Sequence, residues 1–240
     1  MQRFYEYCLT EDLDEIAFVK NPAKNVVVAC LNPHSFVTAL QDGEFHEALL
    51  ACDHLLPDGE GIILTMRTWG NHDLEKIAGD DLHTNLLSKL NTIGGKVYYM
   101  GSTPKVLSLI EKRLAKEYPS VSVRTWAPSI CDELSENESQ EIMDDINSFS
   151  PDILFVSMTA PKQEKWVAKY SSKLTKPTFI ASIGGVFEFY AGTQKRAPHW
   201  AIKIKVEWLV RLIKEPRRMW RRNFISTPKY LYWTWKHRGG

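Results

Sequence analysis

Residues 96–104 read KVYYMGSTP, and a helical pattern follows them as far as Tyr118. The first five residues form a short apolar run, which indicates a buried strand. Gly101 then permits a tight turn, while Thr103 and Pro104 suit the N-cap and the first turn of a helix. A strand that passes through a glycine turn into a helix is the unit from which parallel α/β sheets are built.

The same alternation of strand and helix recurs along the chain. It predicts an α/β protein with a Rossmann-like parallel sheet flanked by helices, whose ligands bind at the carboxyl ends of the strands. The other expected strands are 25–30, 121–125, 153–157 and 178–182, and the expected helices are 36–51, 82–90, 104–118, 139–149 and 161–174, with a further helix from about Glu207.

Charge is distributed very unevenly along the 240 residues. Residues 195–240 hold 13 Lys/Arg against 2 Asp/Glu, whereas residues 1–194 hold 17 against 27. The formal net charge of +1 therefore conceals an acidic body and a basic end. We expect a Rossmann-like domain over 1–194 and a basic, aromatic-rich helical appendage over 195–240. Such an appendage favours phosphate, whether in a lipid head group, a nucleic acid or a diphosphate-linked substrate.

The appendage has the pattern of a helix that lies in a membrane interface. With Pro216 in the first helical turn, a regular α-helix would place the arginines at 217, 218, 221 and 222 on one side. Met219, Trp220 and Phe224 would then face the opposite side, toward lipid. The aromatic residues at 230, 232, 233 and 235 stand among basic residues, as at a boundary of water and lipid. The alternative is that these aromatics close the core and the arginines are a solvated face.

Other features of the sequence narrow the class of protein. The chain has no apolar run of 18 residues and begins with a polar, acidic stretch rather than a signal peptide, so we expect a cytoplasmic protein. Its four cysteines have no zinc-ligand spacing and are expected to be reduced thiols. The dinucleotide-binding, Walker and nucleophile-elbow motifs do not occur.

Polar residues and glycines follow several of the expected strands. Asp58 lies in a glycine-flanked turn at 57–61, although Asp-Gly turns commonly have only a conformational purpose. The loop after strand 96–100 presents helix N–H groups that suit a diphosphate. These loops offer seven candidate substrate-binding residues, which are Gly101, Ser102, Thr159, Gln163, Glu164, Gly184 and Gly185.

A series of short fragments occurs in a characteristic order. They are Leu31-Asn32-Pro33, Pro57-Asp58-Gly59, Ile77-Ala78-Gly79, Gly101-x-x-Pro104, Pro151-Asp152-Ile153-Leu154, Pro161-Lys162-Gln163-Glu164, Arg196-Ala197-Pro198, Glu207-Trp208-Leu209-x-Arg211 and Glu215-Pro216-x-Arg218. Over about residues 25–222 the chain thereby resembles the WecG/TagA/CpsF glycosyltransferases, family 26.

The resemblance implies an inverting hexosyltransferase that moves a sugar from a UDP-sugar to a polyprenyl-diphosphate-linked acceptor, in the synthesis of a bacterial exopolysaccharide, capsule or cell-wall polymer. It implies no required metal and no cofactor. It also implies a catalytic domain with an appendage that engages an anionic membrane surface, peripheral on the inner face of the cell membrane. Asp58 matches the family's proposed catalytic base, and Asn32, Gln163 and Lys76 match polar or basic residues of its pocket. As groups that hold the lipid diphosphate or the membrane, we consider Arg211, Arg217, Arg218, Arg221 and Arg222.

The sequence departs from the family at three positions. Cys30 stands where threonine is common, and Ser157 and Thr159 stand where glycines are common. The donor sugar therefore stays open among glucose, N-acetylmannosamine and uronic acids. Two other functional classes are a non-catalytic peripheral-membrane scaffold and a nucleic-acid-binding protein. The acidic body argues against nucleic-acid binding, because it would repel a long polyanion. Apolar surface on the appendage also suggests self-association away from the membrane.

Overall fold

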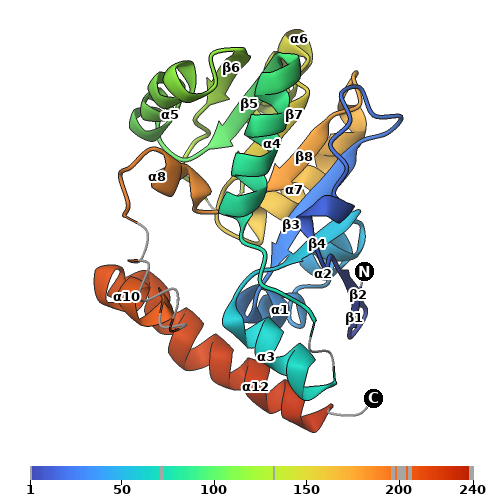
Figure 1. Ribbon diagram of the computed structural model, residues 1–240, viewed down its shortest axis with the longest axis vertical. Coiled ribbons are helices and arrows are strands. Elements are labelled where there is room, and N and C mark those ends of the chain that lie inside the picture. The colour runs from blue at the N-terminus through green and yellow to red at the C-terminus, as the bar shows by residue number, and fades with distance from the viewer. Residues whose placement is uncertain are drawn as a thin grey trace.

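The fold was derived from a computed structural model that describes residues 2–70, 73–131, 133–195, 198, 204 and 207–237. One eight-stranded sheet runs through the molecule in the order β1-β2-β4-β3-β8-β7-β5-β6 (Figure 1). β1 pairs with β2 in antiparallel fashion, and the other seven strands pair in parallel. The strands are β1 Gln2–Phe4, β2 Tyr7–Leu9, β3 Val26–Leu31, β4 His54–Pro57, β5 Gly95–Gly101, β6 Val121–Trp126, β7 Ile153–Ser157 and β8 Phe179–Ser182.

Helices cover both faces of the sheet, which confirms the α/β, Rossmann-like prediction. α4, α5 and α8 pack over one face, against side chains such as Tyr99 and Phe155. α6 and α7 pack over the other face, against alternate residues of the same strands, such as Tyr98 and Leu154. The helices of the body are α1 Pro33–Ala39, α2 Gly43–Leu50, α3 Glu60–Thr68, α4 Gly79–Ile93, α5 Pro104–Glu117, α6 Glu136–Phe149, α7 Lys162–Tyr170 and α8 Val186–Tyr190, with short 3-10 turns η1 Leu13–Glu15 and η2 Ser171–Lys173.

The prediction of one continuous helix over 36–51 was wrong, because the segment forms two helices, α1 and α2. Asp42 caps α2, since its side chain accepts a hydrogen bond from the backbone N–H of Phe45 at 3.0 Å. This cap starts a new helix three residues after α1 ends. α3, α8 and the short strands β1, β2 and β4 were not predicted.

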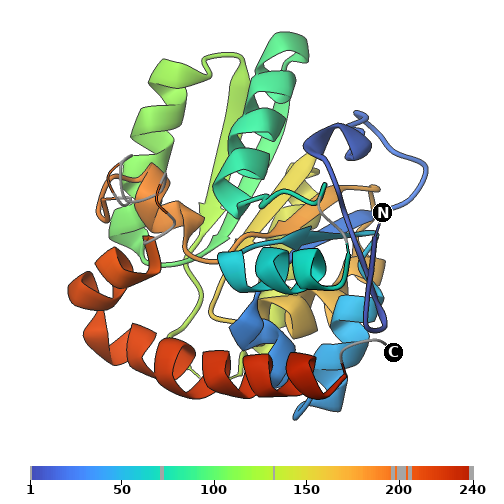
Figure 2. The same cartoon turned by 60° about the horizontal axis from the view of Figure 1, so that its bottom comes forward.

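The C-terminal segment consists of α10 Glu207–Lys214, α11 Pro216–Trp220, the π-helical stretch η3 Arg221–Ser226 and α12 Thr227–Lys236. Together they form a band along one end of the body, close to α1 and α3 (Figures 1 and 2). The helix predicted from Glu207 and the helix start at Pro216 are confirmed. The regular 100° rotation assumed for the arginines fails from Arg221, because a π-helix rotates each residue by a smaller angle.

Part of this band belongs to the hydrophobic core. The Tyr230 ring is fully buried against Phe36, with ring centroids 5.6 Å apart, and its hydroxyl donates to Thr65 Oγ1 at 2.8 Å. Trp233 packs edge-on against Phe36 at 4.8 Å, and Met219 is buried. The expectation that Tyr230 and Met219 face lipid was therefore wrong, since both side chains are buried, and Trp233 is half-buried against Phe36.

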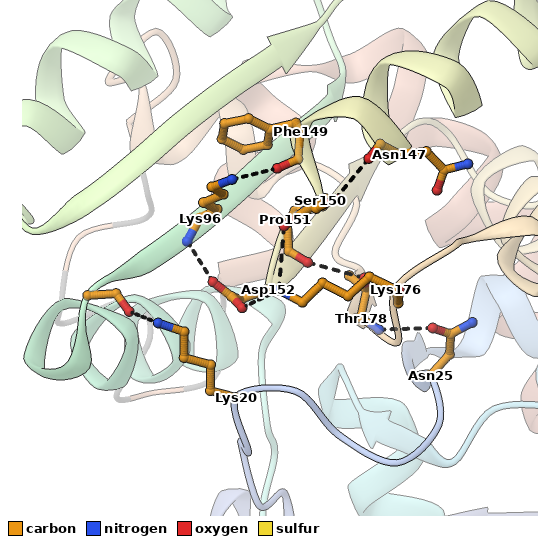
Figure 3. Close-up of polar contacts among 11 residues, drawn as sticks. Lys20, Asn25, Lys96, Asn147, Phe149, Ser150, Pro151, Asp152, Lys176 and Thr178 are labelled. Carbon is orange, nitrogen blue, oxygen red and sulfur yellow. Dashed lines mark hydrogen bonds and ion pairs between the residues drawn. The ribbon is translucent and has the colours of Figure 1, made fainter.

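At the amino ends of the strands, Asp152 ties three strands together (Figure 3). Its side chain accepts from the backbone N–H of Lys96 at 2.8 Å and pairs with Lys176 Nζ at 2.6 Å. Its backbone carbonyl accepts from the N–H of Phe179 at 3.1 Å. Because Asp152 lies at the edge opposite the polar loops, these contacts give the Pro151-Asp152 fragment a structural explanation.

Candidate functional site

The loops predicted to carry the site all leave the carboxyl edge of the sheet. β4, β3, β8, β7 and β5 are consecutive neighbours, so the residues that follow them line one edge. Asn32 and Asp58 come directly after the adjacent strands β3 and β4, whose last residues Leu31 and Pro57 are paired in register. The backbone N–H of Asp58 donates to the Leu31 carbonyl at 2.9 Å. The structure therefore places Asn32 and Asp58 side by side.

Asn32 has a definite local task as the N-cap of α1. Its Oδ1 accepts from the backbone N–H groups of His34 and Ser35 at 3.1 and 3.0 Å. Ser35 Oγ in turn accepts from the Asn32 N–H at 2.7 Å, which completes a capping box. The cap uses only Oδ1, so the amide NH₂ of Asn32 is the group that can address a ligand.

The turn that holds Asp58 depends on its glycines. Gly59 has φ +111°, a conformation that residues with a side chain rarely adopt. At Gly61 an added Cβ would lie 2.5 Å from Cγ of Pro33, so the turn closes directly over the start of α1. Asp58 itself is half-buried at this point. Both glycines thus fix the position of Asp58 relative to Asn32.

Lys76 belongs to the loop between α3 and α4. The next residue, Ile77, donates its backbone N–H to the Pro57 carbonyl at 3.1 Å. This bond holds the loop against the end of β4, one residue from Asp58. Lys76 is half-buried there.

The loop after β5 passes very close to β7. Gly101 has φ +133°, and an added Cβ would lie 2.0 Å from the Ser157 carbonyl oxygen. Ser102 also has a positive φ, of 56°, and its hydroxyl donates to Glu188 of α8 at 2.7 Å. A carboxylate therefore stands beside the start of α5, where we expected a diphosphate. Sequence reasoning missed Glu188, because α8 is only five residues long and was not predicted.

At the start of α7, Gln163 and Glu164 turn inward, and both are only 4% exposed. Gln163 Oε1 accepts from the Met158 N–H at 3.1 Å, and its Nε2 donates to Glu164 Oε1 at 2.7 Å. Burial raises the pKa of Glu164 to about 7. Gln163 therefore fixes the loop between β7 and α7, rather than presenting its whole amide to a ligand as expected.

The remaining residues of this edge lie around that loop. Thr159 is exposed, and Gly184 and Gly185 after β8 are half-buried. The Ser157 hydroxyl donates to the Gly184 carbonyl, which joins the loops after β7 and β8. Desolvation, with the charges of Asp58 and Glu164, raises the pKa of the Cys30 thiol well above its usual range. Cys30 therefore lies in the electrostatic reach of both carboxyl groups.

Three of the predicted arginines are described, and all reach the same edge. Burial, followed by the charges of Arg222 and Arg221, lowers the pKa of His34 to about 4, which places both arginines near the start of α1. His34 Nδ1 lies 2.7 Å from Ser226 Oγ of η3. The guanidinium of Arg211 lies over the Phe189 ring of α8, 5.3 Å from its centroid. The side chains of Arg217 and Arg218 lie outside the described residues.

The appendage also presents apolar side chains to solvent. Trp220 is 58% and Trp235 72% exposed. Trp220 and Phe224 form an aromatic pair with ring centroids 4.4 Å apart. Over the residues that the structure describes, none of the helices combines the length and the apolar character needed to cross a bilayer. The domain boundary expected between residues 194 and 195 stays a prediction. Tyr230 of α12 belongs to the same hydrophobic core as α1 and α3, which lie in the body.

Together, the sheet and its edge define a Rossmann-like α/β protein whose polar loops and arginine-bearing C-terminal segment meet at the carboxyl ends of the strands. The chain belongs to the glycosyl transferase WecG/TagA/CpsF family, whose model matches residues 4–240. This confirms the resemblance seen in the sequence.

Several curated relatives are named N-acetylglucosaminyldiphosphoundecaprenol N-acetyl-β-D-mannosaminyltransferase. One from Bacillus subtilis (strain 168) is 30% identical over 204 residues, covering 85% of this chain and 77% of the relative. One from Bacillus spizizenii is 29% identical over 214 residues, covering 89% and 80%. One from Staphylococcus aureus (strain MW2) is 26% identical over 215 residues, covering 90% and 82%.

Proposed function

We propose that this chain is an inverting glycosyltransferase that moves a sugar from a UDP-sugar to a polyprenyl-diphosphate-linked sugar. The names of the relatives support N-acetylmannosamine as the transferred sugar and a lipid-diphosphate-linked N-acetylglucosamine as the acceptor. The observation that carries the proposal is the placement of Asp58 beside Asn32 at the carboxyl edge, with Arg221 and Arg222 near the start of α1.

In the proposed reaction, Asp58 is the general base. Its carboxylate takes the proton of an acceptor hydroxyl while that oxygen forms a bond to the anomeric carbon of the donor. The bond from the anomeric carbon to the phosphate oxygen breaks on the opposite face, and UDP leaves with the electron pair. General-base assistance of this kind contributes about 10² to 10⁴ in rate.

Cationic groups of the chain would meet the charge that develops on UDP and the charge of the acceptor. Ile77 donates to the Pro57 carbonyl at the end of β4, and this bond supports the neighbouring Lys76 as the group that would meet the leaving diphosphate. Arg211, Arg221 and Arg222 would hold the lipid diphosphate, since a guanidinium binds phosphate in bidentate fashion. The same role for Arg217 and Arg218 is proposed from the sequence alone.

The donor is expected to bind across the loops at 101–102, 159–164 and 184–185. Ser102 donates to Glu188 at the start of α5. A diphosphate could bind there only after this contact rearranges. Alternatively, the contact stays and Glu188 orients a hydroxyl of the donor sugar. Asn32 offers its amide NH₂ at the other end of this edge.

We further propose that the enzyme binds the inner face of the membrane through the exposed aromatic side of its appendage. Trp220, Phe224 and Trp235 supply apolar surface beside basic residues, the combination that suits an anionic interface. Such binding would bring the carboxyl edge toward a lipid-linked acceptor.

The reaction is tested by incubating the full chain with a panel of UDP-sugars and with polyprenyl-diphosphate-linked N-acetylglucosamine, and by measuring UDP release and the lipid product. We expect release that depends on both substrates, with UDP-N-acetylmannosamine among the donors used. A chain that binds liposomes but releases no UDP with any donor would instead be a non-catalytic scaffold.

A further inference from the structure

A small pocket lies between α2 and α7, and Glu164 of α7 belongs to its lining. Its volume is about 100 Å³. The exposed Ala51 and Ala168 belong to its lining, as do the buried Glu164 and Ser182, so it leads from the surface to a buried polar floor. A pocket of this size is too small for a sugar or a nucleotide, which need roughly 300 Å³ or more.

Two buried polar atoms of this lining have no hydrogen-bonding partner among the described residues. They are Oε2 of Glu164 and Oγ of Ser182, in side chains only 4% and 1% exposed. Buried polar groups are nearly always paired, with protein or with ordered water. A polar pocket needs only about 10–15 Å³ of accessible volume to hold one water, so this one has room for more than one.

Glu164 connects this pocket to the proposed substrate edge. Glu164 belongs to the lining of the pocket, its Oε2 has no partner among the described residues, and its Oε1 accepts from Gln163 Nε2 at 2.7 Å. Gln163 in turn accepts from the Met158 N–H at 3.1 Å. Among the described residues, the charge of Glu164 contributes to the raised pKa of the thiols of Cys30 on β3 and Cys52 after α2.

We propose that the pocket binds ordered water through Glu164 and Ser182, and that Glu164 is a positioning residue that orients Gln163 and the loop after β7. Water bonded to Oε2 fixes the carboxyl group, the carboxyl group fixes the Gln163 amide, and the amide fixes the Met158 N–H. The water site stands on the pocket itself, whereas the effect on donor binding rests on the proposed function.

The water is tested by a high-resolution crystal structure of the full chain. We expect electron density for water within hydrogen-bonding distance of both Glu164 Oε2 and Ser182 Oγ. In Ser182→Ala, the hydrogen bond between this water and the hydroxyl of residue 182 should be lost. A dry pocket, or a direct bond between the two side chains, would overturn the water site.

The positioning role is tested by the affinity for UDP, measured by calorimetry. Glu164→Leu removes the acceptor for Gln163 and should weaken UDP binding about tenfold, the effect of one lost hydrogen bond. Glu164→Gln retains an acceptor and should stay within about threefold. Glu141→Gln is the matched control, because that carboxylate is exposed on α6.

The outcomes separate the two proposals. If Glu164→Leu folds and binds UDP as the natural chain does, or if Glu164→Gln is as weak as Glu164→Leu, Glu164 does not position the loop by accepting a hydrogen bond. If Glu164→Leu fails to fold, the Gln variant and the crystal structure still decide the matter. A natural chain that binds no UDP at all contradicts both the proposed function and the effect on donor binding, but leaves the water site to be judged by its density.

Discussion

Replacing Glu164 by glutamine should change how stability depends on pH. The pKa of this carboxyl group is about 7 in the folded chain, against 4.5 when it is exposed. A raised pKa means that the folded chain binds the proton more tightly. The stability linked to this proton is therefore fully present below pH 4.5 and is lost as the pH rises through 7. Glutamine does not ionise, so the Glu164→Gln variant loses no stability from this position as the pH rises.

The magnitude follows from the size of the shift. At 1.36 kcal/mol per unit, the natural chain should lose about 2–3 kcal/mol relative to Glu164→Gln between pH 5 and pH 8. Water in the pocket would solvate the carboxylate, so this figure is an upper value. Glu164 is almost fully buried, and no large screening by bulk solvent applies.

Urea unfolding, followed by tryptophan fluorescence at several values of pH, measures this difference. His34 and His83 also titrate below their ordinary pKa because they are buried, but both are present in the two proteins and largely cancel in the comparison. We expect the gap in unfolding free energy to widen in favour of the variant as the pH rises. A gap that stays constant from pH 5 to pH 8 would refute the ionisation of a buried Glu164.

Three further substitutions test other parts of the structure. Gly101→Ala should lower the free energy of unfolding by about 3 kcal/mol or more, because the added Cβ would meet the Ser157 carbonyl and the φ of residue 101 is positive. Urea unfolding measures this loss, and an unchanged midpoint would contradict the close approach. Tyr230→Phe removes the bond to Thr65 and should cost about 1 kcal/mol in the same assay, whereas no loss would mean that α12 is not docked as described. Trp220→Ser should reduce flotation with anionic liposomes without lowering the unfolding midpoint, and equal flotation would remove Trp220 from the membrane contact.

Much of the fold could be predicted because its central strands are continuous apolar runs. The strand at 153–157 is fully buried, and an apolar run of this length is typical of a strand that is covered on both faces. β4 was missed because its four residues, His54–Pro57, are too few to show a period. The π-helical stretch Arg221–Ser226 carries no sequence pattern that separates it from an α-helix.

The site could be predicted only as far as chain order allows. Parallel strands bring the residues after them to one edge, so the neighbourhood of Asn32 and Asp58 follows from the topology. Side-chain burial does not follow from order alone. Gln163 and Glu164 stand at a helix start that could equally face solvent, and their inward orientation is set by Met158 and by α2. The Ser102 to Glu188 contact joins residues 86 positions apart, and no local pattern predicts it.

The role of Asp58 is the central claim. Its most direct test compares Asp58→Asn with the natural chain, in sugar transfer to the lipid-linked acceptor and in affinity for UDP. Asp144→Asn, an exposed carboxylate of α6, serves as the control. A general base predicts a transfer rate lower by about 10² to 10⁴ with UDP affinity nearly unchanged. Transfer by Asp58→Asn at the rate of the natural chain would contradict that role.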